Sequence, residues 1–237
     1  MKNRNIIIVL GLLLSITACS SGSQMVKENR DVVVKEADLG DYKKIDAKGS
    51  VEVRYEQTRT PYFRIEVNED ILTKVVYRVE KGTLFIYNEG KIAPSHYIVY
   101  TGSSDLEEIK LSGSGDLLIK DGLKVKSLEV SLAGDGDVKI RDVEGKRIKS
   151  TLKGSGNIEL AGKVEELQAS LNGSGDIEAF ALITESSSAT LKGSGDIEVY
   201  ADKKLKAEIN GSGNISYKGA PDISTKIKGS GNVARRQ

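Results

Sequence analysis

The residues of this chain that could do chemistry are concentrated in short turns, mostly of sequence Gly-Ser-Gly followed by Asp or Asn. Glycine-rich loops can cradle phosphate, and Asp side chains in turns can bind calcium. Phosphate binding is disfavoured because no GxxxxGK(S/T) motif occurs and each turn leads into a strand-like segment, not into a helix. Calcium binding is disfavoured because each turn carries one acid, which Asn replaces in three of the seven turns. We therefore expect no metal site and no cofactor.

A charged stripe is the second candidate for chemistry. The acids Glu159, Glu178 and Glu198 and the lysines Lys153 and Lys192 occupy outward positions of the repeats. Enzymes that process polysaccharides gather carboxylates and a basic residue on one exposed face. A stripe of charges is also the ordinary solvated face of a soluble protein, and this simpler interpretation is favoured. We expect no catalytic residues and no enzymatic activity, with a polysaccharide-processing enzyme as the alternative.

The composition narrows the possible functions further. The 237 residues include one histidine, His96, and one cysteine, Cys19, so an internal disulfide is impossible and a zinc site is disfavoured. His96 has no recognisable nucleophile as a partner in the sequence, and we assign it no role. The net charge is +1 and the chain has no Trp, which argues against nucleic acid as a partner.

Residues 1–18 predict a lipoprotein signal peptide. Two basic residues, Lys2 and Arg4, precede an apolar run over residues 6–14, which is too short to span a bilayer. Residues 16–19, Ile-Thr-Ala-Cys, resemble a bacterial lipobox, in which the cysteine is acylated and becomes the new N-terminus. An ordinary signal peptide would instead leave Cys19 as an unpaired thiol in an exported chain. We expect lipidation at Cys19, with the membrane as a partner through its acyl chains.

The residues after Cys19 predict the location. Ser20 and Ser21 follow it, without the Asp at the second position that retains enteric lipoproteins in the inner membrane. We expect an exported, lipid-anchored protein of the bacterial cell envelope, at the outer membrane, with the leaflet left open. Residues 19–30 are small, polar and charged, which predicts a flexible tether.

The glycine turns recur with a period of about 20 residues, which is typical of stacked-repeat proteins. A degenerate earlier copy surrounds Gly49 and lacks the second glycine. Glycine suits these turns because the chain must bend at positive φ while neighbouring coils leave no room for a Cβ atom. The structural turn residues are Gly113, Gly115, Gly134, Gly136, Gly154, Gly156, Gly173, Gly175, Gly193, Gly195, Gly211, Gly213, Gly229 and Gly231.

Apolar and polar residues alternate on both sides of each turn, as in Leu128-Glu129-Val130-Ser131-Leu132, which predicts strands with one buried face. Residues 106–237 therefore predict an all-β fold, a single-stranded parallel β-helix with about 20 residues per coil. The period favours the right-handed form, because left-handed β-helices repeat every six residues. Aspartate or asparagine after each turn can bond to nearby amides, and Asn157, Asn214 and Asn232 could form amide ladders.

Residues 31–105 are also strand-like and predict first coils with a strand-rich N-terminal cap. A hairpin is expected around Lys81 and Gly82. Most of the tyrosines lie in this region, where they could cover the start of the sheet or form a partner surface. Arg235 and Arg236 at the other end disfavour end-to-end association, although a self-associating end stays open.

The mature chain resembles one known family. The stretches DLGDYKKIDAKGSVEVRYEQ, EVNEDILTKVVYRVEKGTLFIY and SSDLEEIKLSGSGDL, followed by serial GSG(D/N) turns, are similar to the head GIN domain family of putative auto-transporter adhesins. The resemblance spans residues 31–233 and implies an exported or lipid-anchored protein of Bacteroidetes-like bacteria. It also implies a right-handed β-helix like that of pectin lyases, without their catalytic residues. This chain departs from the pattern at Asp135, which precedes Gly136 where other turns have serine.

These observations favour a non-catalytic binding or adhesion-type protein, whose partner is an envelope protein or a glycan. A polysaccharide-processing enzyme is one alternative. A structural component that self-assembles through its coil ends, and is therefore a homo-oligomer, is the other. The sequence does not identify the binding partner.

Overall fold

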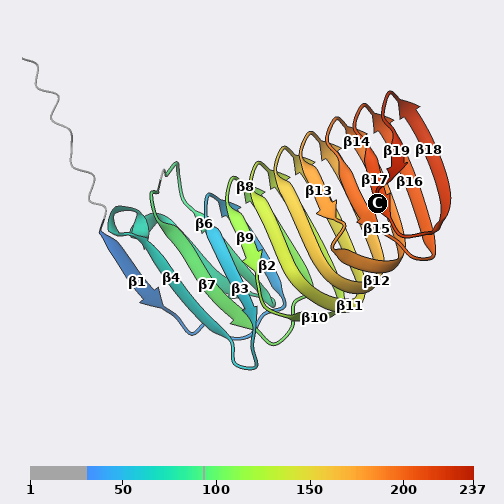
Figure 1. The fold of residues 1–237 in the computed structure, drawn as a ribbon. Coiled ribbons are helices and arrows are strands. Elements are labelled where there is room, and N and C mark those ends of the chain that lie inside the picture. The colour runs from blue at the N-terminus through green and yellow to red at the C-terminus, as the bar shows by residue number, and fades with distance from the viewer. Residues whose placement is uncertain (1–30, 93) are drawn as a thin grey trace, which may run out of the picture.

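The computed structural model describes residues 31–92 and 94–237. The predicted signal peptide (1–18), the lipidation residue Cys19 and the predicted tether (19–30) lie outside these residues. Strands form an elongated stack that begins at β1 and ends at β18 and β19 (Figure 1). One short helix interrupts the strands, η1 (Glu69–Lys74). Within the described part of the chain, no helix combines the length and apolar character needed to cross a membrane.

The repeat region consists of coils that pair in parallel. Each coil has one strand before its glycine turn and one after it, and we call the two stacks of strands the pre-turn layer and the post-turn layer. The pre-turn layer contains β8 (Glu108–Gly113), β10 (Leu123–Gly134), β14 (Leu182–Gly193), β16 (Lys204–Gly211) and β18 (Asp222–Gly229). The post-turn layer contains β9 (Asp116–Ile119), β13 (Asp176–Ala179), β15 (Ile197–Tyr200), β17 (Ile215–Lys218) and β19 (Val233–Arg235). The long strands β11 (Asp137–Gly154) and β12 (Asn157–Gly173) contribute to both layers.

The register places equivalent residues of successive coils directly over one another. Leu111 pairs with Leu132, Leu132 with Leu152, and the same column continues through Leu171, Leu191 and Ile209 to Ile227. From Leu111 to Ile209 this column is buried, as is the post-turn column from Leu117 to Ile215. Stacked aliphatic ladders therefore form one continuous core between the layers. This confirms the predicted parallel β-solenoid with about 20 residues per turn.

Residues 31–105 continue both layers toward the N-terminus. In the pre-turn layer, β5 (Val75–Glu80) pairs antiparallel with β6 (Thr83–Asn88), and β6 pairs in parallel with β2 (Lys44–Gly49), which pairs with β8. In the post-turn layer, β1 (Val32–Glu36) and β4 (Tyr62–Asn68) are antiparallel, as are β4 and β7 (Tyr97–Ser103). Strand β3 (Glu52–Gln57) then connects β7 to β9 by parallel pairing.

Two local predictions for this region are confirmed. The β5–β6 hairpin turns at Lys81 and Gly82, which both have positive φ angles (50° and 72°), as tight hairpin turns require. The degenerate repeat also exists, because Gly49 pairs with Gly113 in the same register as the later turn glycines. Val51 occupies the place of the missing second glycine, because its carbonyl oxygen lies below Gly115, and its side chain is buried in the core.

Candidate functional site: the glycine turns and the faces beside them

The first glycine of each turn has two reasons to be glycine. Its φ angle is positive, from 112° at Gly113 to 157° at Gly211. A Cβ atom at this position would also collide with the carbonyl oxygen of the equivalent glycine in the preceding coil. Both constraints exclude other residues. This column contains Gly113, Gly134, Gly154, Gly173, Gly193, Gly211 and Gly229, and Gly49 begins it.

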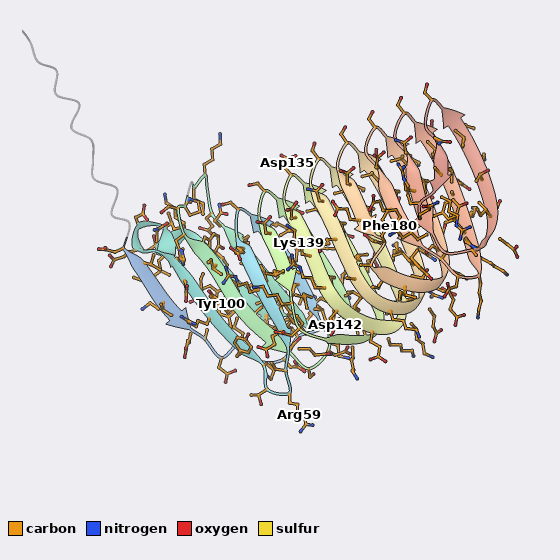
Figure 2. All side chains as sticks on the ribbon, viewed as in Figure 1. Arg59, Tyr100, Asp135, Lys139, Asp142 and Phe180 are labelled. Carbon is orange, nitrogen blue, oxygen red and sulfur yellow. The ribbon has the colours of Figure 1, made fainter. Side chains whose placement is uncertain are left out.

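The second glycine of each turn has only the steric reason. None of these residues has a φ angle in the left-handed region, yet a Cβ atom would collide with a backbone carbonyl oxygen of the coil before. Below Gly115 that oxygen belongs to Val51, and elsewhere it belongs to another turn glycine. The column contains Gly115, Gly136, Gly156, Gly175, Gly195, Gly213 and Gly231. Figure 2 shows the turn residue Asp135 along one edge of the stack, and Asp142 at the opposite edge.

The acid or amide after most turns forms a hydrogen bond to the neighbouring coil. The backbone N–H of Asp137 donates to Oδ1 of Asp116 (2.9 Å), and that of Asp196 donates to Oδ1 of Asp176 (2.8 Å). Asn214 donates to Oδ1 of Asp196 through both its backbone N–H (2.7 Å) and its Nδ2 (3.1 Å). These carboxylates therefore act as acceptors that join coils.

The observed pairing differs from the expected asparagine ladder. Asn157 donates from Nδ2 to Oδ1 of Asp137 (3.0 Å), so the amide meets a carboxylate and not another amide. The physical reason is the order of the residues in the column, because Asn157 and Asn214 each follow an Asp. Asn232 alone follows another asparagine, Asn214. No group of three or more His, Cys, Asp or Glu side chains within residues 31–92 and 94–237 is placed to hold a metal ion.

An acidic face lies on the post-turn layer. We use this name for Glu159, Glu178, Glu198, Asp176 and Asp196. Glu159 pairs in register with Glu178, and Glu178 with Glu198, so three carboxylates stack at the spacing of adjacent strands. Partial burial raises the pKa of Glu198, and the negative charges of Glu178, Asp176 and Asp196 add to the effect, while Arg236 opposes it. Arg141 lies 3.7 Å from Glu159 and offsets the repulsion at that end.

The lysines lie on the other side of the turn. Lys153 and Lys192 immediately precede the first glycines of their turns and belong to the pre-turn layer. The prediction that they share one charged stripe with Glu159, Glu178 and Glu198 is wrong. The chain reverses at the turn between them, so the two sets of charges belong to different layers. The acid–base group expected for polysaccharide cleavage is therefore not assembled from these five residues.

Lysine and asparagine alternate in the last five coils of the column that contains these lysines, whereas the coils before them have Ser112 and Ala133 at this position. Lys153, Asn172, Lys192, Asn210 and Lys228 are paired in register through β11, β12, β14, β16 and β18, and we call them the lysine–asparagine column. All five side chains are exposed. The sequence contains the signal that identifies the column, because each of its residues stands one position before a turn glycine.

Several tyrosines of the N-terminal region pack inside the fold. The Tyr42 hydroxyl hydrogen-bonds that of Thr101 (2.7 Å), and burial raises the pKa of Tyr42 well above its usual value. Tyr55 is also buried, and its pKa is raised to about 12. Tyr77 stacks on Phe63 across the two layers, with ring centroids 4.7 Å apart.

Tyr100 is the clearest case of a ring that sequence reasoning could not place. The guanidinium groups of Arg54 and Arg64 lie 5.3 Å and 5.2 Å from its ring centroid. Arg54 also donates to the Tyr100 hydroxyl at 3.1 Å. His96, to which no role was assigned, lies 3.2 Å from Glu66. These contacts connect β3, β4 and β7 and leave the Tyr100 ring covered by cations.

The fold is a β-solenoid whose outward residues form columns along the stack. Residues 41–221 match the family model described as putative auto-transporter adhesin, head GIN domain, and the chain belongs to this family. This confirms the resemblance found in the sequence. A comparison with curated proteins gave no match.

Several solved structures of Parabacteroides and Bacteroides proteins are similar to this chain. A putative lipid binding protein from Parabacteroides distasonis is 30% identical, with a TM-score of 0.76, over 89% of this chain and 98% of that one. A putative adhesin from Bacteroides fragilis is 25% identical, with a TM-score of 0.83, over 88% of this chain and 99% of that one. A putative adhesin from Parabacteroides merdae is 26% identical, with a TM-score of 0.69, over 88% and 98% of the two chains.

The turn geometry predicts the effect of adding one methyl group at a second glycine. Gly156→Ala would place Cβ against the carbonyl oxygen of Gly136, and because both atoms belong to hydrogen-bonded coils neither can move freely. We expect a loss of free energy of unfolding on the order of 3 kcal/mol, at the upper end of overpacking effects. Chemical denaturation followed by far-UV circular dichroism measures it. The matched control is Gly122→Ala, where a Cβ atom would meet only the Asp142 side chain. Equal losses for both variants would contradict the steric explanation.

The acidic face predicts a pH-dependent stability. Because its pKa is raised in the folded protein, Glu198 holds its proton more tightly there than in the unfolded chain. Its contribution to stability therefore falls as pH rises through the folded pKa, and it stays unfavourable at neutral pH. We expect Glu198→Gln to raise the melting temperature at neutral pH. The gain should disappear at a pH below the ordinary pKa of glutamic acid.

Differential scanning calorimetry at several pH values tests this expectation. Glu159→Gln is the control, because its carboxylate already has Arg141 nearby and should gain nothing from neutralisation. A Glu198→Gln variant that is less stable than the wild type at neutral pH would show that this carboxylate is favourably paired.

Proposed function

We propose that this protein is a lipid-anchored, non-catalytic binding protein of the bacterial cell envelope, held at the outer membrane. The observation that carries the proposal is the in-register stack, which repeats the same outward positions at a fixed spacing, so that their side chains form regular columns. Such a surface suits a partner that is itself extended or repetitive. The family of the chain and the putative adhesins among its structural relatives support an adhesion-type role.

The anchor would attach at one end of the stack. The described chain begins at residue 31 and enters the fold through β1, whereas β18 and β19 form the opposite end (Figure 1). A lipid on Cys19 would therefore hold the β1 end near the membrane and leave the coils beyond it accessible. Two or three acyl chains give stable attachment, whereas a single chain binds a membrane only marginally.

The non-catalytic part of the proposal rests on the separation of charges by the turn. General acid–base cleavage of a glycosidic bond needs two carboxyl groups on either side of one bond. Glu159, Glu178 and Glu198 instead form a single column along the stack, and the lysines are on the other layer. The proposed partner is an envelope protein or a glycan, and we propose that it is bound and not cleaved.

The anchor is tested with Cys19→Ser in the native bacterium. We expect the variant to lose incorporation of radiolabelled palmitate and to move from the detergent phase to the aqueous phase, because no acyl chain can be attached. Ser21→Ala is the control and should remain in the detergent phase. A Cys19→Ser variant that stays labelled and membrane-bound would refute lipidation at this residue.

Release of fragments from anionic polysaccharides by the purified wild type would refute the non-catalytic role.

Self-assembly through the last coil is a second candidate function, favoured by one observation. Ile223 and Ile227 of β18 continue the core columns, yet 43% and 44% of their surfaces are exposed. In the described part of the chain β18 pairs only with β16, so its other edge has free backbone groups.

Static light scattering over a range of concentrations tests this candidate. If the last coil associates, the mean mass should rise with concentration, and Ile223→Lys with Ile227→Lys should abolish the rise by placing charges in the contact. Val32→Lys, an equally exposed change at the opposite end, is the control. A mass that stays at one chain for the wild type throughout would exclude self-assembly through this end.

A further inference from the structure

The lysine–asparagine column has a strict alternation in space. Lys153 pairs with Asn172, Asn172 with Lys192, Lys192 with Asn210, and Asn210 with Lys228. Because adjacent strands are separated by about 4.8 Å, the lysines recur about every 9.6 Å along the stack. Between every two lysines an amide offers one acceptor and two donors. The column therefore presents a positive charge and a neutral polar group in regular succession.

The three lysines of the column form no ion pairs with other described residues. Within residues 31–92 and 94–237, none of them has a carboxylate oxygen within ion-pair distance, whereas other lysines of the pre-turn layer do. Lys149 lies 2.7 Å from Glu129, and Lys206 lies 2.8 Å from Glu208. Glu208 borders the column, but its strongest partner is Lys206, whose hydrogen bond lowers the pKa of Glu208. The positive charges of the column are thus available to an outside partner.

A second column of short hydroxyl side chains runs beside the first. It ends in a charged pair, Glu208 on β16 and Lys226 on β18. Before that pair, Thr151 pairs with Ser170, and Ser170 with Thr190, two positions earlier on the same strands as the lysines and asparagines. All three are half-buried, so their hydroxyls lie close to the surface of the sheet. A shallow cavity of about 120 Å³ opens at the distal end, and its polar lining residues are Thr190, Lys192, Asn210, Lys226, Lys228 and the single acid Glu208. The face therefore combines charge, amide and hydroxyl groups with a groove at its distal end.

The residue types on this face indicate which class of polymer it could bind. Neither column contains an aromatic residue from β11 to β18, so stacking on bases or on the apolar faces of sugars is not available. A nucleic acid also carries a phosphate on every nucleotide, about 3.4 Å apart along one strand of a duplex, which is much closer than the lysine spacing. A polysaccharide with an acid on every second sugar has the matching period, because an extended disaccharide unit is about as long as two strand separations.

From these observations we propose that the lysine–asparagine column binds an anionic polysaccharide that carries one carboxylate or sulfate per disaccharide. Lys153, Lys192 and Lys228 each engage one acidic group, and Asn172 and Asn210 bond to the neutral sugar between them. The hydroxyl column bonds to the sugar hydroxyls. This proposal rests on the proposed binding function and names the chemical class of its partner.

The test is a titration of the full-length, detergent-solubilised protein with hyaluronan oligosaccharides of three disaccharides, followed by isothermal calorimetry. The variant Lys153→Gln, Lys192→Gln, Lys228→Gln should raise Kd by about tenfold or more, as expected for the loss of three exposed charge pairs. The matched control replaces three lysines outside the column, Lys126→Gln in β10, Lys146→Gln in β11 and Lys163→Gln in β12. These are also exposed and without ion pairs among the described residues, and the control should bind within about twofold of the wild type.

Three further ligands test the spacing. A neutral chitin oligosaccharide of equal length should not bind, and polygalacturonate and single-stranded DNA should bind more weakly per charge than hyaluronan. Equal binding of all the anionic polymers, or an equal loss in both triple variants, would overturn the proposal in favour of non-specific charge attraction.

The same titration separates this inference from the proposed function. If hyaluronan fails to bind while Cys19 is lipidated and the protein is membrane-bound, the ligand class is wrong and the anchored binding protein stands. If lipidation also fails, the proposed function fails with it.

Discussion

The whole structure depends on how closely successive coils approach one another at their turns. At each turn, a carbonyl oxygen of one coil lies where the next coil would carry a Cβ atom, and only glycine removes that collision. The close approach lets backbone N–H groups of one turn reach carbonyl oxygens of the turn before, as from Ser155 to Gly134 (3.1 Å) and from Ser174 to Gly154 (3.0 Å). Hydrogen bonding thus continues around the corner, and the register of the strands on both sides is fixed by it.

A fixed register decides where every outward side chain lies. Since a strand alternates sides with each residue, a slip of one position would exchange the buried leucine column with the lysine–asparagine column. The turn prevents that slip in every coil, so residues about 20 positions apart in sequence become neighbours at the distance between strands. The regular spacing of charges on the pre-turn layer follows from backbone geometry.

The two ends of the stack differ in how far their core residues are covered. At the N-terminal end, β1 and β5 run antiparallel to their neighbours, and Phe63 and Tyr77 stack between the layers. At the C-terminal end the coil simply stops, and Ile223 and Ile227 are left partly open to solvent. Arg235 and Arg236 place two exposed basic residues close to that end. The asymmetry is a property of the sequence, because the aromatic residues are concentrated before residue 105.

The sequence by itself determined the repeat, the strands, the stacked turns and the family, because glycine period and alternation are local signals that recur in every coil. It also identified the hairpin at Lys81 and Gly82 and the degenerate turn at Gly49. Only the tertiary structure decided which charges belong together. Lys153 and Glu159 are close in sequence, and the chain reversal between them assigns one to each layer. Likewise Arg54, Arg64 and Tyr100 meet through strand pairing over long sequence distances, for which no local pattern exists. The physical reason is that periodicity fixes which side of a strand a residue occupies, whereas neighbours across strands depend on register and topology.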